Sequence, residues 1–113
     1  MSSDVLSKSA LIAELNDEFR KTGIGGKTVM TRAVADLPAA VVSRAVTIVQ
    51  TFNDFTEDND PHGEHDFFRF ELTGETFFWK CDYYDKNLQF GSDDPSNPEK
   101  TTRVATLMLA SDY

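Results

Sequence analysis

Two aromatic runs separated by Thr73-Gly74 constrain the fold more than any other stretch of this chain. A two-residue loop that ends in Gly suits the tight primed turns that join antiparallel strands. We therefore predict a hairpin of residues 65–72 and 75–83, with Phe70 opposite Phe77. Because side chains alternate across a strand, this register places large apolar residues on one face, which helices must cover. These residues are Phe68, Phe70, Leu72, Phe77 and Trp79.

The start of the chain has the apolar spacing of a helix. Leu11, Leu15 and Phe19 recur every four residues, so we expect a helix over residues 7–22 that buries these side chains. Gly23 then supplies the left-handed residue that commonly follows a helix end. This helix is predicted to cover the core.

Two more helices are predicted further along the chain. Asp36 is a good N-cap and Pro38 suits a first helical turn, which predicts a helix over residues 38–52. Asn97-Pro98-Glu99 carries the same kind of start signal and favours a C-terminal helix. A buried strand over residues 103–109 is the alternative, because both faces of that segment are apolar.

The expected fold class is α+β. We predict a single domain over residues 1–113, with about three helices packed on a small, mostly antiparallel sheet centred on the 65–83 hairpin. Residues 27–33 are β-branched and add a strand, and residues 88–90 form a short strand in an otherwise irregular connection. Residues 1–6 are expected to be flexible.

The charge of this chain is concentrated in one segment. The formal net charge is −8, and six of the 19 acidic residues lie between residues 53 and 68, where no Lys or Arg occurs. Such a field repels nucleic-acid phosphates and attracts cations or basic protein surfaces. We therefore expect no direct contact with nucleic acid, and no apolar run is long enough for a membrane span.

The cysteine count and the N-terminal residues bear on the cellular compartment in which this protein works. Cys81 is the only cysteine, so an intramolecular disulfide cannot form and a zinc site built from thiolates is excluded. No basic segment followed by an apolar run marks a signal peptide, which predicts a cytoplasmic protein. The role and exposure of Cys81 and the oligomeric state stay open at this stage.

The acidic segment is the main candidate for a binding site. Pro61 and Gly63 break regular structure there, so the segment is predicted to be a loop that leads into the hairpin. Its carboxylates are expected to bind a basic partner surface. The partner-binding candidates are Asp54, Glu57, Asp58, Asp60 and Glu64.

A metal-dependent hydrolase is the alternative function, using the loop 58–66. Carboxylates and imidazoles suit zinc, manganese or iron, and His62, His65 and Asp66 are the metal-ligand candidates, with Asp60 and Glu64 nearby. The hairpin register places Asp82 opposite His65, where it could hold the imidazole in position. No HExxH or calcium-loop pattern is present, so we expect no cofactor, with a divalent ion as the exception. No catalytic residue is assigned.

A third interpretation is structural. Asp and Asn side chains commonly cap turns, and His65 and Asp66 can fix the start of the hairpin by hydrogen bonds without any chemistry.

Several short strings of residues resemble the DUF3768 family of small alphaproteobacterial proteins, often carried on plasmids. The strings include Gly63-Glu64-His65-Asp66-Phe67, Phe78-Trp79-Lys80 and Asp82-Tyr83-Tyr84-Asp85. The resemblance implies a bacterial, cytoplasmic setting on a mobile element and supplies no mechanism. Together with the acidic loop, it suggests a non-enzymatic inhibitor of a host defence complex that handles nucleic acid.

Overall fold

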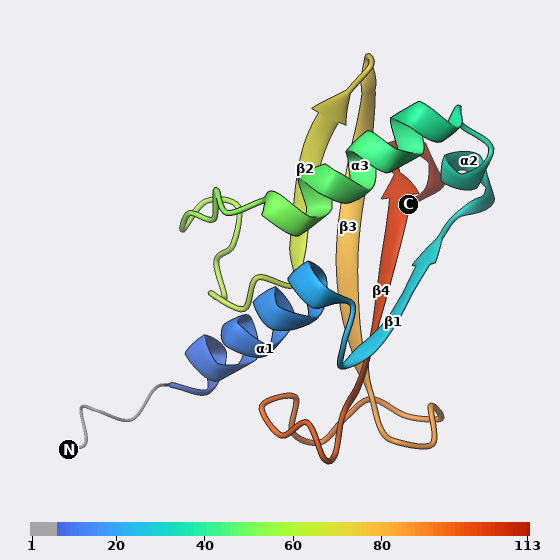
Figure 1. Ribbon diagram of the computed structural model, residues 1–113. Helices are drawn as coiled ribbons and strands as arrows, with labels where there is room; N and C mark the ends of the chain where they lie inside the picture. Colours follow the sequence, from blue (N-terminus) through green and yellow to red (C-terminus); the bar gives the residue numbers. More distant parts are fainter. Residues whose placement is uncertain (1–6) are drawn as a thin grey trace.

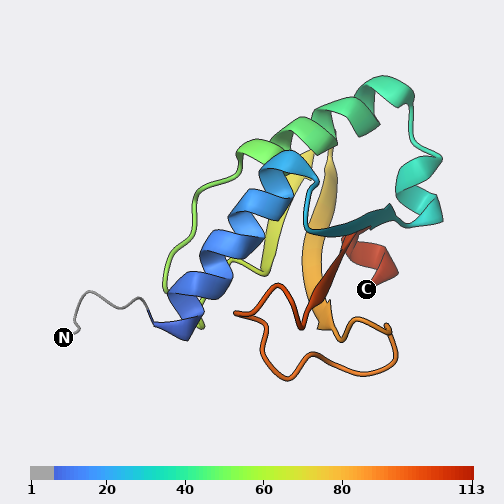
Figure 2. The ribbon, with the colours of Figure 1, turned by 60° about the horizontal axis from the view of Figure 1, so that its bottom comes forward.

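Helices α1 (Lys8–Thr22) and α3 (Ala39–Thr51) lie side by side on one face of a four-stranded sheet (Figures 1 and 2). The computed structural model describes residues 7–113, so the expected flexibility of residues 1–6 lies outside the described residues. The other elements are β1 (Gly26–Met30), α2 (Arg32–Ala35), β2 (Phe67–Leu72), β3 (Glu75–Tyr84), β4 (Thr102–Leu109) and the short 3-10 helix η2 (Ala110–Asp112). The predicted α+β class is confirmed.

The sheet has the strand order β1-β4-β3-β2. Strands β2, β3 and β4 pair antiparallel, whereas β1 pairs parallel to β4. The predicted hairpin register is confirmed, with Phe68 opposite Trp79 and Phe70 opposite Phe77. Thr73 and Gly74 have φ angles of 53° and 80°, as a primed turn requires. The hairpin supplies two of the four strands, and β2 forms an edge of the sheet.

The core lies between the sheet and the two long helices. The predicted aromatic face of the hairpin is buried, and Phe70 stacks on Phe77 with 5.0 Å between ring centroids. From the helices, Phe19, Ala45 and Val49 pack against this face. Burial of these large apolar side chains is the main source of stability in a domain of this size.

Helix α1 has the predicted limits but buries a different face. The Ser7 hydroxyl caps its first turn by accepting a hydrogen bond from the Ala10 amide, and Gly23 follows its end with φ of 76°. Leu11, expected inside, is 37% exposed. The buried face instead includes Asn16, which donates to the Glu64 carbonyl of the loop, and Arg20, which donates to carbonyls at the end of α3.

The segment between β1 and α3 also differs from prediction. Thr31 ends the strand and caps the short helix α2, with its hydroxyl accepting from the Val34 amide. Asp36 therefore lies at the C-terminal end of α2 and does not cap α3, which begins after Pro38 without a side-chain cap. Helix α3 itself is confirmed within a residue of its predicted limits.

The C-terminal segment is a strand, so the favoured helix is wrong. The Asn97 side chain accepts a hydrogen bond from the Glu99 amide and forms only a local turn. Residues 102–109 pair on both sides, with β1 and with β3, which buries the segment and overrides the helical spacing. The predicted strand over residues 88–90 is also wrong, since Leu88 has a φ of 59° in an exposed turn.

No helix among the described residues has both the length and the apolar character needed to cross a lipid bilayer.

Candidate functional site

The acidic loop, defined as residues 53–66, runs along α1 before entering β2 (Figures 1 and 2). Three of its carboxylates, those of Asp54, Glu57 and Asp58, are exposed. The backbone around them is ordered by the Asn59 side chain, which accepts from the Thr56 amide and donates to the Asp54 carbonyl. This part of the loop is a compact turn that directs its acids outward.

Two predicted partner-binding residues point inward. Asp60 is 8% exposed, and its carboxylate accepts from the His65 amide at 3.2 and 3.3 Å. Glu64 is half-buried and accepts a hydrogen bond from the Tyr83 hydroxyl at 3.0 Å. These two carboxylates close the base of the loop, and the Asp60 contact is a turn-capping bond of the kind that the structural interpretation expected of Asp side chains.

His65 connects the loop to α1. Its Nδ1 lies 3.0 Å from both carboxylate oxygens of Asp17, and its Nε2 lies 3.6 Å from Asp60 Oδ2. The imidazole also stacks on the Phe55 ring, with 3.9 Å between centroids and 4° between planes. His65 is thus enclosed by an aromatic ring and two carboxylates.

The predicted pairing of His65 with Asp82 is wrong. His65 has a φ of 57°, so the chain departs from extended geometry before β2 begins at Phe67. Asp82 pairs instead with Val104 of β4, and its carboxylate lies 3.3 Å from Lys80 Nζ. The group that holds the imidazole comes from α1.

Arg20 connects α1 to the end of α3, and its guanidinium lies 5.5 Å from the ring centroid of Phe55 in the loop. Its side chain is 1% exposed, and its guanidinium donates to the Val49 and Phe52 carbonyls at 2.8 Å each. It also donates to Asp17 Oδ1 at 2.7 Å. Arg20 therefore occupies the C-terminal carbonyls of α3 and orients the carboxylate that receives His65.

Asp17 and Arg20 are not among the site residues predicted from the sequence. Their spacing of three residues on a helix was the available signal, because such pairs lie on one face. A charged pair of this kind on an exposed helix usually faces solvent, and only its contacts across the fold reveal its role.

A second polar network lies beneath the loop and centres on Asn16, which is 0% exposed. Its amide nitrogen donates to the Glu64 carbonyl and to the Tyr83 hydroxyl, both at 2.9 Å. Its amide oxygen accepts from Arg103 Nε at 2.6 Å. One side chain of α1 thus satisfies groups from the loop, β3 and β4.

Burial perturbs the titration of three groups beside this network. It raises the pKa of the Tyr83 hydroxyl and raises that of the Cys81 thiol to about 12. It also raises the pKa of half-buried Asp66, and the nearby Glu64 carboxylate adds to this effect. At neutral pH the Cys81 thiol is protonated, which is the opposite of what a nucleophile requires.

The candidate metal ligands do not form a coordination group. His62 is exposed, His65 is bound to Asp17, and Asp66 is half-buried. His62 and His65 share only the shallow hollow beside Phe55 and Asp60. Within residues 7–113, no three His, Cys, Asp or Glu side chains are placed to hold a metal ion.

The fold and this site define a small α+β domain with an acidic loop fastened to its first helix. The sequence profile of the family described as "Protein of unknown function (DUF3768)" matches residues 30–112, so the chain belongs to this family. The resemblance seen in the short strings is thereby confirmed. No curated protein and no solved structure gives a significant match.

Proposed function

We propose that this chain is a non-enzymatic binding protein that presents Asp54, Glu57 and Asp58 to a basic protein surface. The observation that carries the proposal is the combination of exposed acids with a firmly held loop. A preorganised loop loses less conformational entropy on binding, which favours association.

The negative potential of the loop comes from its own residues, because the exposed charges on the neighbouring helix α1 are of both signs and include Glu14, Glu18 and Lys21. No Lys or Arg lies within residues 53–68. Carboxylates gathered in this way steer a cationic partner and give it a fast, salt-dependent association.

A cytoplasmic protein that handles nucleic acid is the proposed partner class. Channels that hold nucleic acid are lined with Lys and Arg, and carboxylates can occupy them in place of phosphates. On a mobile element of the kind that the family resemblance suggests, such binding would inhibit a host defence complex. A captured partner is therefore expected to lose its nucleic-acid binding when this protein is added.

The direct test uses a short Lys- and Arg-rich peptide and isothermal titration calorimetry at low and high salt. The variant Asp54→Asn/Glu57→Gln/Asp58→Asn should bind about tenfold more weakly, because it removes the local field. The matched control Glu75→Gln/Asp93→Asn/Glu99→Gln removes the same charge from other exposed positions. Equal losses for the two variants would show that only net charge matters.

Capture from host cells provides the second arm of the test. A specific partner should be retained by the control variant and lost by the loop variant, and its retention should weaken steeply with salt. The metal-dependent hydrolase is tested by metal analysis of protein purified without chelators. Stoichiometric zinc or manganese would favour the hydrolase over the binding proposal.

A further inference from the structure

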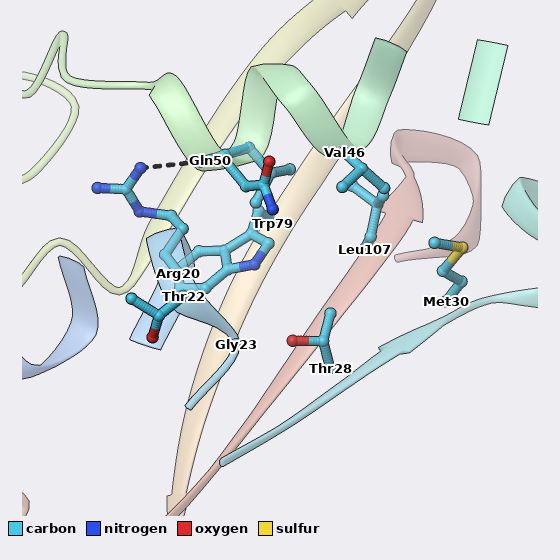
Figure 3. Close-up of a pocket in the computed structure, with 10 residues that line it drawn as sticks. Arg20, Thr22, Gly23, Thr28, Met30, Val46, Gln50, Trp79 and Leu107 are labelled. Carbon is cyan, nitrogen blue, oxygen red and sulfur yellow. Dashed lines mark hydrogen bonds between the residues drawn. The ribbon is translucent and has the colours of Figure 1, made fainter. Parts of the chain in front are cut away.

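A cavity of about 280 Å³ lies between the end of α1, helix α3 and strands β1 and β4, away from the acidic loop (Figure 3). Its walls are mostly apolar and include Met30, Val46, Val49 and Leu107. An apolar cavity of about 150 Å³ can hold benzene, so this one has room for about a dozen non-hydrogen atoms. Cavities of this kind are typical small-molecule sites, although most are somewhat larger.

Trp79 provides a hydrogen-bond donor that faces this cavity. The residue is 1% exposed, yet its indole nitrogen points into the cavity and has no hydrogen bond to the other residues drawn (Figure 3). Within residues 7–113, Arg20 Nε is the only buried side-chain polar atom without a partner, so the Trp79 N–H is open to the cavity, where water or a bound molecule can accept its hydrogen bond. The cavity therefore supplies the space in which an acceptor for Trp79 would lie.

Two further polar groups border the same space. The Gln50 amide extends over the cavity from α3, and the Thr28 hydroxyl points toward it from β1 (Figure 3). Both residues are exposed, so they lie where the cavity opens to solvent. A few polar groups that converge on an apolar cavity fix the orientation of a bound molecule.

The charges around the cavity indicate a neutral occupant. No acidic residue lines it, although the protein carries a net charge of −8. Arg20 contributes only its aliphatic part, since its guanidinium turns away from the cavity toward α3 (Figure 3). The guanidinium also pairs with Asp17. An anion would meet no free cation here, and a cation would meet no carboxylate.

We infer that this cavity binds a small, neutral molecule that accepts a hydrogen bond from the Trp79 indole. The site is separate from the proposed function of the acidic loop. Because Trp79 is the only tryptophan in the chain, its indole proton gives a single, assignable resonance in two-dimensional NMR spectra.

Isoquinoline and naphthalene are matched probes, since they share a shape and differ in one ring-nitrogen acceptor. At a pH where isoquinoline is neutral, it should shift the Trp79 indole resonance saturably. Naphthalene at equal concentrations should bind about tenfold more weakly, the worth of one hydrogen bond. Naphthoate should not compete, because the cavity offers no free cation.

Cavity-filling variants show whether the response comes from this site. Val46→Phe fills the cavity from α3 and Thr28→Ile fills it from β1, so each should abolish the isoquinoline shift. Thr47→Phe places the same ring on the exposed side of α3 and should leave the shift unchanged. Thermal unfolding checks that each variant is folded. Two filling variants are used so that the test still works if one of them does not fold.

Three results would overturn the inference. The first is the absence of a saturable shift in the wild-type protein, which would mean that the cavity holds water only. The second is an unchanged shift in a folded filling variant. The third is equal affinity for isoquinoline and naphthalene, which would remove the role of the Trp79 donor.

Discussion

The imidazole Nδ1 of His65 lies 3.0 Å from both carboxylate oxygens of Asp17, a residue 48 positions earlier in the chain. This contact joins the base of the acidic loop to the first helix. Arg20 donates to the same carboxylate and to the chain at the end of α3. The conformation of the loop therefore depends on α1, and changes in α1 should be measurable in the loop.

Replacing His65 by Ala should destabilise the fold. The change removes the contact with Asp17 and the stack on Phe55, so the free energy of unfolding should fall by about 1–2 kcal/mol. Urea unfolding followed by Trp79 fluorescence measures this difference. His62→Ala is the matched control, because His62 is exposed in the same loop and should change stability by less than about 0.5 kcal/mol. Equal effects of the two substitutions would contradict the role assigned to His65.

Gly26→Ala should be among the most harmful small substitutions. Gly26 pairs with Arg103 in the parallel ladder, and a Cβ at this position would overlap the Arg103 carbonyl oxygen. Relief requires β1 to move away from β4, which should cost about 2–4 kcal/mol of unfolding free energy. Gly91→Ala is the control, since the nearest atom to its new Cβ is 3.8 Å away. A normal melting temperature for Gly26→Ala would show that the two strands lie further apart.

Asp66→Asn should stabilise the protein at neutral pH. Burial raises the folded pKa of Asp66 above its ordinary value of 3.8, so the folded chain binds this proton more tightly than the unfolded chain. In the wild type, the stabilisation that comes from binding this proton is fully present below the unfolded pKa of Asp66, and it is lost as the pH rises through the folded pKa. The extra unfolding free energy of Asp66→Asn relative to the wild type should therefore vanish in acid.

Urea titrations between about pH 3 and pH 7, the range that spans ordinary carboxyl pKa values, measure this dependence. Asp58→Asn is the matched control, because it makes the same substitution at an exposed position of the acidic loop. A variant that is less stable than the wild type at neutral pH would indicate that the Asp66 charge is favourable where it lies.

Native Cys81 should react slowly with thiol reagents. The thiol is buried, and burial raises its pKa to about 12, so the thiolate needed for reaction is scarce. Labelling by iodoacetamide should follow the rate of unfolding and accelerate in urea. Glu75→Cys in the exposed hairpin turn is the positive control and should label quickly in the native state. If native Cys81 were labelled as fast as the cysteine of Glu75→Cys, the thiol would be accessible to solvent in the folded protein.

Local signals made the hairpin predictable. Thr73-Gly74 allows one turn family, and alternation of Phe and Trp leaves one register that buries them together. The C-terminal segment had no such signal. Its helical spacing and start residues were outweighed by β1 and β3, which are distant in sequence and pair with it on both sides.

The candidate site was predictable only in outline. Charge counting located the loop and its exposed acids Asp54, Glu57 and Asp58, because charge is additive along a sequence. It could not show that Asp60 turns inward or that His65 meets Asp17. Those contacts depend on how α1 packs, and its buried face contains polar residues that apolar periodicity does not detect.

The position of β4 has a consequence for synthesis of the protein. It is the last strand along the chain, yet it lies between β1 and β3. While a ribosome is still translating, the hairpin has an open edge and β1 has no neighbour to pair with. The sheet becomes continuous only when β4 emerges, so a nascent chain halted before Thr102 leaves the edge of β3 unpaired and is prone to aggregate.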